Sequence, residues 1–252
     1  MTTTIGYNIV IMSDLHLGMK DCKPKKILEF LDNMSTELLI LNGDIIDFDA
    51  LRRGSKWKNK HTKVITKLLE ISKHTPIIYI RGNHDEDIRS MFGIEIGNIS
   101  FVDEYIIEMK EWIEHDTFID KKFLVIHGDQ VDVIVSRFKI LAQIGSIGYD
   151  ISLRLNTWYN RYREWKKLPY HSISKIIKEN FKKAWKFINN FENKAMELAK
   201  EKNCHGIICG HIHIPVIKNI DGLTYINSGD WVENFTAVVL TKQNRFEFIK
   251  ID

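Results

Sequence analysis

Five short clusters in the sequence bring together histidine, aspartate and asparagine side chains, and each follows directly after an apolar run. They lie at residues 14–16, 43–47, 82–85, 127–129 and 210–213. Their imidazole, carboxylate and amide groups form a ligand set suited to Mn, Fe or Zn. A structural zinc site needs only four ligands, usually including cysteines, so this larger set predicts two ions that share a bridging carboxylate. The seven candidate ligands are Asp14, His16, Asp44, Asn83, His127, His211 and His213.

No single cluster predicts this site by itself. A lone Asp-x-His after a strand is more often a cap or a turn, and Gly-Asp is an ordinary turn signal. The Gly-His-x-His sequence at 210–213 is more informative, because alternate residues of an extended segment project to the same side. The order of the five clusters and their shared place after apolar runs indicate the metal site.

The elements that must position these clusters follow from the apolar pattern. Short apolar runs without alternation predict buried strands; they lie at 8–12, 38–41, 77–80, 123–126 and 206–209. Helical periodicity at 26–34 and 62–72 separates the first three, and more strand-like runs occupy 216–251. Strand–helix alternation predicts an α/β layered fold. Ligand sites in such sheets gather at the carboxyl ends of strands, so the five clusters are expected at one rim.

The segment 131–202 has a different character. Its 72 residues contain 15 lysines and arginines against 7 aspartates and glutamates, although the whole chain carries only +3. Residues 175–202 predict a long amphipathic helix, and 133–165 are rich in Ile, Leu, Trp and Tyr. We predict a single domain, 1–252, with a helical insertion at about 131–202. An ordinary pair of core helices is the alternative.

The ordered clusters resemble those of the calcineurin-like metallophosphoesterase superfamily, over residues 14–213. The resemblance implies a β-sandwich flanked by α-helices and two divalent ions, with Mn²⁺ first and Fe or Zn as alternatives. It implies that one ion binds Asp14, His16, Asp44 and His213. It implies that the other binds Asp44, Asn83, His127 and His211, with Asp44 as the bridge.

The resemblance also implies hydrolysis of a phosphate ester or anhydride, in which a metal-activated water attacks phosphorus. The departing oxygen needs a proton, and His84, beside Asn83, is the expected donor. The carboxylate of Asp47 would orient His84, although a helix cap or turn is an open alternative. Arg81 is expected to contact the phosphate. Asp129 and Asp230 are expected either to orient ligand histidines or to form turns.

Within the superfamily the chain is most similar to enzymes related to UDP-2,3-diacylglucosamine pyrophosphatase. The similarity lies at 168–175, 187–192, 208–213 and 225–233. It implies a nucleotide-diphosphate-linked lipid substrate, cleaved to the lipid monophosphate and UMP. The best-known branch has arginine where this chain has His84, which points to a side branch with a different substrate.

The basic insertion suits a lipid-linked diphosphate or an anionic membrane surface. The expected substrate contacts are Arg81, Arg161, Arg163, Lys166 and Lys167. Ordinary core packing of the apolar residues and solvation of the charges is the alternative. A nuclease or nucleotide phosphodiesterase of the same superfamily is a second candidate, and a non-catalytic scaffold is a third.

The cysteines and the apolar runs predict the compartment. The three cysteines are odd in number and form no Cys-x-x-Cys pair, which favours a reducing cytosol. Residues 1–11 lack a signal-peptide pattern, and no run of about 18 apolar residues occurs. We expect a cytoplasmic protein with peripheral contact to the inner membrane face. Nucleic acid is a less favoured partner, and nothing indicates an obligate protein partner.

Overall fold

The computed structural model describes residues 5–112, 118–131, 166 and 173–251. The chain divides into two compact units, residues 1–131 with 195–252, and residues 132–194. The predicted insertion at about 131–202 encloses the second unit. Most of that unit lies outside the described residues, so the single domain with a helical insertion stays a prediction.

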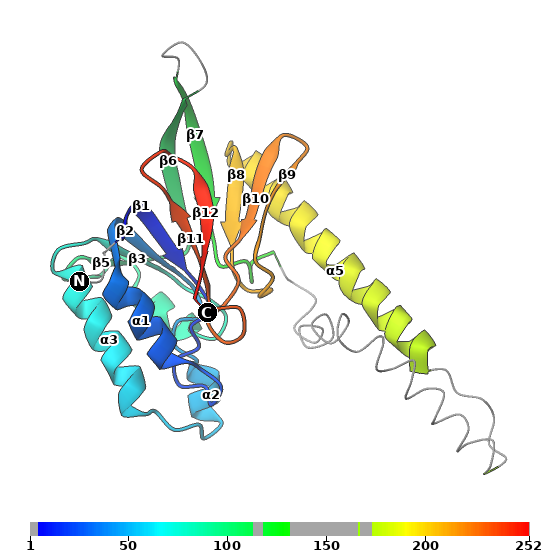
Figure 1. Ribbon diagram of the computed structural model, residues 1–252, viewed down its shortest axis with the longest axis horizontal. Helices are drawn as coiled ribbons and strands as arrows, with labels where there is room; N and C mark the ends of the chain where they lie inside the picture. The colour runs from blue at the N-terminus through cyan, green and yellow to red at the C-terminus, as the bar shows by residue number, and fades with distance from the viewer. Residues whose placement is uncertain (1–4, 113–117, 132–165, 167–172, 252) are drawn as a thin grey trace. The chain divides into compact units, whose positions relative to one another are not determined.

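Seven strands form the first sheet, in the order β12-β11-β1-β2-β3-β5-β4 (Figure 1). The four strands β1, β2, β3 and β5 pair in parallel, and antiparallel strands complete both edges. Their bounds are β1 Ile5–Met12, β2 Met34–Asn42, β3 Ile77–Ile80, β4 Glu95–Ile96, β5 Ile99–Val102, β11 Thr236–Leu240 and β12 Phe246–Lys250.

Five strands form the second sheet, in the order β6-β7-β8-β10-β9. Here β7, β8 and β10 are parallel, whereas β6 and β9 pair antiparallel at the edges. Their bounds are β6 Tyr105–Trp112, β7 Phe118–Val125, β8 Gly206–Cys209, β9 Val216–Ile220 and β10 Leu223–Asn227.

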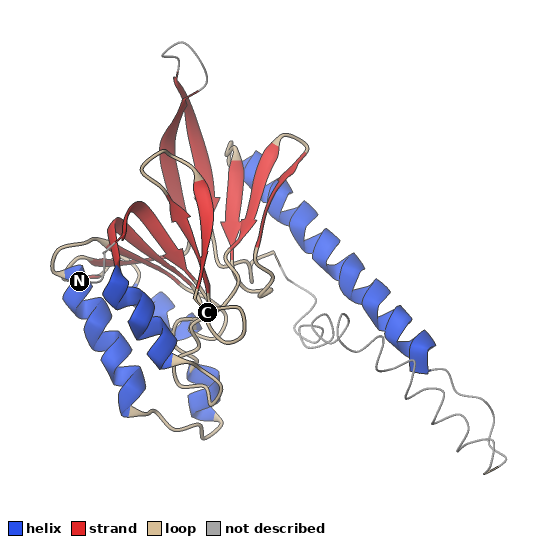
Figure 2. Ribbon diagram, viewed as in Figure 1, coloured by secondary structure: helices blue, strands red, loops and turns tan. Residues whose placement is uncertain are grey.

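Helices α1 (Pro24–Asn33) and α3 (Asn59–Ser72) cover the outer face of the seven-stranded sheet (Figure 2). Each connects two neighbouring parallel strands, so each begins at the carboxyl edge of the sheet. The shorter helices α2 (Phe48–Arg52) and η1 (Glu86–Met91) follow β2 and β3, and α5 spans Ile173–Glu201. No helix among the described residues is both long and apolar enough to cross a membrane.

The central strands are buried on both faces, which explains their unbroken apolar runs. Val10 and Leu39 pack against α1 and α3. Their neighbours Ile11 and Ile40 point the other way, because side chains alternate along a strand. They pack against residues of the second sheet such as Ile208. The two mixed sheets therefore form a sandwich with helices on its flank, which confirms the predicted α/β fold class.

All five predicted strands are present as β1, β2, β3, β7 and β8. One helix boundary was wrong, since the predicted helix 26–34 ends at Asn33. Met34 is already extended and pairs with Ile5 across the β1–β2 ladder. The predicted helix at 175–202 corresponds to α5.

Candidate metal centre

The loops after β1 and β2 pair with each other at the rim of the sandwich. The backbone N–H of Asp14 donates to the carbonyl of Gly43 at 3.0 Å, and that of His16 donates to the carbonyl of Asp44 at 2.9 Å. The loop after β8 joins them, because the N–H of His211 donates to Asp14 Oδ2 at 3.0 Å. Backbone hydrogen bonds thus hold the carboxyl ends of three strands together before any side chain contributes.

Asp44 lies at the centre of the cluster and is fully buried. Its Oδ2 atom is 3.4 Å from His127 Nε2, 3.8 Å from His16 Nε2 and 4.0 Å from His84 Nε2. Its Oδ1 atom accepts a hydrogen bond from the backbone N–H of His84 at 2.8 Å. One oxygen therefore fixes the loop after β3, and the other faces three imidazoles.

A second carboxylate, Asp14, occupies the other side of the cluster. Its Oδ1 atom is 2.9 Å from His213 Nε2 and 3.7 Å from His16 Nε2. Asp14, His16 and His213 thus place ligand atoms within 4.8 Å of one another, and so do Asp44, His127 and His211. Six of the seven predicted ligands converge in two adjacent groups.

Three atoms that face the space between the two groups of candidate ligands show whether the site suits cations. His16 Nε2, His127 Nε2 and Asp44 Oδ2 are buried and have no hydrogen-bond partner. The opposite ring nitrogens are occupied, His127 Nδ1 by the carbonyl of Asn42 at 2.9 Å and His16 Nδ1 by Asp47 at 3.2 Å. Buried polar atoms are normally paired, so a converging unpaired set of nitrogen and oxygen donors fits metal ions. Imidazole and carboxylate donors suit Mn, Fe or Zn. The adjacent groups of buried histidines and aspartates are consistent with a site for two metal ions.

Asn83, the seventh predicted ligand, is exposed in the turn between Gly82 and His84. The backbone N–H groups on both sides of it are held, Gly82 by Asp85 and His84 by Asp44. The turn is therefore fixed to the rim at which the other ligands meet. Its assignment as a ligand stays a prediction.

Backbone conformation marks the same residues. Among the described residues, nine other than glycine have positive φ, and five of these are candidate ligands. Left-handed conformations cost about 1 kcal/mol or more per residue, and they cluster at functional sites. The five ligands are Asp14 (φ 55°), His16 (48°), Asp44 (53°), His211 (67°) and His213 (57°).

Glycines in three of the motifs make room for the ligand side chains. A Cβ on Gly43 would lie 2.4 Å from the His127 ring, and a Cβ on Gly82 would lie 2.2 Å from Asp44 Oδ1. A Cβ on Gly210 would lie 2.5 Å from Asp14 Oδ2. Real Cβ contacts are never this short. These glycines are therefore required by close packing around the ligands.

The model of the calcineurin-like phosphoesterase family matches residues 7–215. This stretch contains all five motifs and most of the chain. The chain belongs to the calcineurin-like phosphoesterases. With its buried aspartate and histidine cluster, it is a metallophosphoesterase, which is a hydrolase of phosphoric esters.

Individual relatives are distant. UDP-2,3-diacylglucosamine hydrolase of Haemophilus influenzae (strain PittGG) is 24% identical, over 95% of this chain and 97% of that protein. The solved structure of Vacuolar Protein Sorting 29 from Cryptosporidium parvum has a TM-score of 0.45 and 11% identity, with 97% of each chain covered. Yfce, a phosphoesterase from E. coli, has a TM-score of 0.39 and 14% identity, with 97% of this chain and 99% of that one covered.

Asp47 connects two histidines of this metallophosphoesterase. Its Oδ1 atom is 3.2 Å from His84 Nδ1, and its Oδ2 atom is 3.2 Å from His16 Nδ1. Oδ1 also accepts from the N–H of Ala50 and so caps α2. The helix-cap interpretation is therefore confirmed, and the same carboxylate contacts His84; its role in orienting that histidine stays a prediction.

Burial and charge set the protonation of the cluster in opposite directions. Burial lowers the pKa of His16, but the carboxylates of Asp14, Asp47 and Asp44 outweigh it and raise that pKa to about 10. Burial also lowers the pKa of His127, yet Asp44 and Asp14 raise it to about 9. Burial raises the pKa of the Asp44 carboxyl, but the charge of His127 holds it well below its usual range. Protons and metal ions must therefore compete for these two rings.

Arg81 is held by three carboxylates. Its Nε donates to Asp103 at 2.6 Å, and one terminal nitrogen donates to Glu86 and Asp129, both at 2.8 Å. Its side chain is 7% exposed. These bonds tie the loop after β3 to the loop after β7, which carries His127. A direct contact between Arg81 and phosphate stays a prediction.

Of the two expected orienting carboxylates, Asp129 binds Arg81 through Oδ2. Asp230 accepts from the backbone N–H groups of Val232 and Glu233 and forms a turn. The remaining predicted substrate contacts, Arg161, Arg163 and Lys167, lie outside the described residues, and Lys166 is exposed.

Asp85 is a structural residue to which the sequence assigned no role. It is buried and accepts from the backbone N–H groups of Ile45 at 2.8 Å and of Gly82, and from the Tyr79 hydroxyl at 2.8 Å. It thereby joins the loop after β2 to the loop after β3. Its place directly after His84 in the third motif was the signal available in the sequence.

The close packing of Gly82 can be tested by adding one methyl group. Gly82→Ala should lower the free energy of unfolding by about 1–3 kcal/mol, because the new Cβ collides with Asp44. It should also weaken Mn²⁺ binding, measured by calorimetry, at least about tenfold. Gly6→Ala is the matched control, since nothing lies within 4 Å of its Cβ. Wild-type metal binding in Gly82→Ala would contradict the packing argument.

Proposed function

We propose that this metallophosphoesterase hydrolyses the diphosphate bond of a nucleotide-linked lipid such as UDP-2,3-diacylglucosamine, giving a lipid monophosphate and UMP. The observation that carries the reaction is the unpaired Asp44 Oδ2 atom facing three imidazole nitrogens. The substrate is supported by the relative from Haemophilus influenzae, which aligns over nearly the whole of both chains.

The proposed ligands divide into two sets that share Asp44. Two of the groups found in the structure correspond to them, one around Asp14 and one around Asp44. When bound, two Mn²⁺ ions would polarise the phosphoryl group and lower the pKa of the attacking water. The first set is Asp14, His16, Asp44 and His213, and the second is Asp44, Asn83, His127 and His211.

His84 is the proposed proton donor to the departing oxygen, a role that matters most when that oxygen would otherwise leave as an alkoxide. Its Nδ1–H donates to Asp47, and its Nε2 faces Asp44. Burial raises the pKa of the Asp47 carboxyl, but its bonds to His16 and His84 hold it far below its usual range. Asp47 therefore stays ionised and fixes the orientation of the His84 ring. With 24% of its side chain exposed, His84 can reach a substrate from the solvent side.

A nucleotide phosphodiesterase is the second candidate, and the His84–Asp47 pair favours it. Cleavage of a phosphodiester releases an alkoxide, which needs a proton from a donor such as His84. Cleavage of a diphosphate releases a phosphate monoester, which is stable as an anion. A non-catalytic scaffold is disfavoured, because the complete aspartate and histidine set is present together with His84.

A substrate panel tests the proposal directly. Mn²⁺-loaded protein should hydrolyse UDP-2,3-diacylglucosamine faster than CDP-lipids, nucleotides or single-stranded DNA. Faster cleavage of nucleotides or DNA would transfer the assignment to the second candidate, and a steep salt dependence of binding would mark a nucleic acid ligand.

Asp44→Asn should reduce turnover at least about a hundredfold and remove at least one Mn²⁺ per chain, since a neutral amide cannot bridge two cations as a carboxylate does. Metal content is measured by mass spectrometry and turnover with the best substrate of the panel. Asp32→Asn is the control, because Asp32 pairs with Lys67 on the surface. Full turnover by Asp44→Asn would exclude the bridging role.

His84→Ala should slow esters with poor leaving groups by about 10²–10⁴-fold and nitrophenyl esters much less, because a nitrophenolate leaves without a proton. The rates are compared across phenyl esters of graded leaving-group pKa. Equal losses across the series would exclude proton donation by His84. Asn and Gln at position 84 separate loss of the proton from loss of volume.

Metal binding should release protons, because the pKa values of His16 and His127 lie at about 10 and 9 without metal and bound rings must be neutral. Mn²⁺ affinity should therefore rise as the pH increases from 6 to 9. Calorimetry in buffers of different ionisation enthalpy counts the protons. The His127→Gln variant should release fewer protons on Mn²⁺ binding, whereas the variant His74→Gln, at an exposed position, should release as many as the wild type. A pH-independent affinity would contradict the competition.

A further inference from the structure

A cavity of about 460 Å³ lies where α1 and α3 begin. It shares no residue with the metal centre. Five lysines line it, and no aspartate or glutamate does. We call it the lysine pocket; its lysines are Lys23, Lys25, Lys26, Lys58 and Lys60.

The lysine pocket concentrates positive charge. None of the ion pairs found in the described part of the chain includes any of its five lysines. The Nζ atom of Lys26 also lies 4.1 Å above the ring of Phe235. Like charges around one cavity repel each other, and they create a positive potential that attracts an anion.

Two helix N-termini add to this potential. Lys23 precedes α1 and Lys58 precedes α3, and neither helix has an acidic residue in its first turn. Helix N-termini carry a partial positive charge, which favours phosphate. Both helices begin at the same edge, so their N-termini meet at the pocket.

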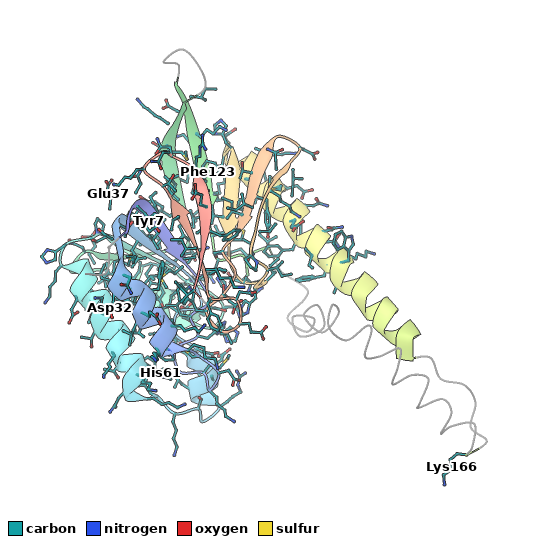
Figure 3. The ribbon with its side chains drawn as sticks, in the orientation of Figure 1. Tyr7, Asp32, Glu37, His61, Phe123 and Lys166 are labelled. Atoms are coloured by element: carbon teal, nitrogen blue, oxygen red, sulfur yellow. The ribbon has the colours of Figure 1, made fainter. Side chains whose placement is uncertain are left out.

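His61 brings an imidazole ring to the lysine pocket. It lines the pocket and is only 2% exposed, at the end of α3 nearest the pocket (Figure 3). Its Nδ1 accepts from the backbone N–H of Lys58 at 3.3 Å, so the ring proton is on Nε2. Nε2 makes no hydrogen bond to any described residue. This N–H is therefore available to a ligand oxygen in the pocket.

We propose that the lysine pocket binds the phosphate groups of an anionic ligand at a site separate from the metal centre. The volume falls in the range of small-molecule sites and exceeds the need of a single phosphate. Several lysines acting together suit a multiply charged diphosphate. Phosphate groups occur in soluble diphosphates and, as phosphomonoesters or phosphodiesters, in lipid headgroups.

Titration of inorganic pyrophosphate into metal-free protein tests the proposal, since removing the metal silences the other phosphate site. Lys58→Gln/Lys60→Gln should weaken binding at least tenfold. The matched control is Lys63→Gln/Lys73→Gln, which removes two exposed charges on and after α3 that do not line the pocket. It should change the dissociation constant less than twofold. No binding to wild-type protein at millimolar pyrophosphate, or equal losses in both double variants, would overturn the proposal.

His61→Phe tests the geometry of the site, because it keeps a buried ring but removes the Nε2 donor. It should weaken pyrophosphate binding severalfold with the net charge unchanged, and unaltered binding would remove His61 from the site.

Sedimentation with phosphatidylglycerol and phosphatidylcholine vesicles shows whether the bound phosphate belongs to a lipid headgroup or to a soluble diphosphate. Association with anionic vesicles alone that is lost in Lys58→Gln/Lys60→Gln assigns a lipid headgroup. Pyrophosphate binding without vesicle association assigns a soluble diphosphate. The metal-free titration involves no turnover, so its failure would leave the proposed hydrolysis untouched.

Discussion

The rim of the sandwich is organised by the buried carboxylate of Asp44. One oxygen holds the backbone of His84, and the other faces the imidazoles of His16, His84 and His127 without a hydrogen-bond partner. A buried unpaired carboxylate is costly. The surrounding imidazoles can offset this cost, because they hold protons or bind cations beside this oxygen.

This constraint explains why the protein tolerates an unfavourable backbone here. Asp14, His16 and Asp44 all have positive φ, and Gly43 and Gly82 leave no room for a Cβ. The loops are held in these conformations by the hydrogen bonds between them and by Asp85, which joins two of them. The stability of the rest of the fold thus offsets the cost of the strained backbone at these loops, and the strained loops set the positions of the ligand side chains.

The same edge of the sheet gives two different electrostatic surroundings. At the metal centre, aspartates dominate and raise the pKa of two histidines. The described residues that line the lysine pocket include five lysines and no carboxylate, and two helix N-termini add partial positive charge. Both arise because each parallel strand ends, and each crossover helix begins, at the carboxyl edge of the sheet. One hydrogen bond, from Cys22 Sγ to the carbonyl of Leu15, joins the two regions.

The sequence by itself determined the strands, the ligand types and their common edge, since apolar runs and the motifs after them are local signals. It did not determine that Asp47 both caps α2 and binds His84, or that Arg81 is tied to three carboxylates. It also gave no sign of the lysine pocket, whose residues come from two separate helices. These features depend on distances between segments far apart in the chain, which only the packing of the sheets and helices decides.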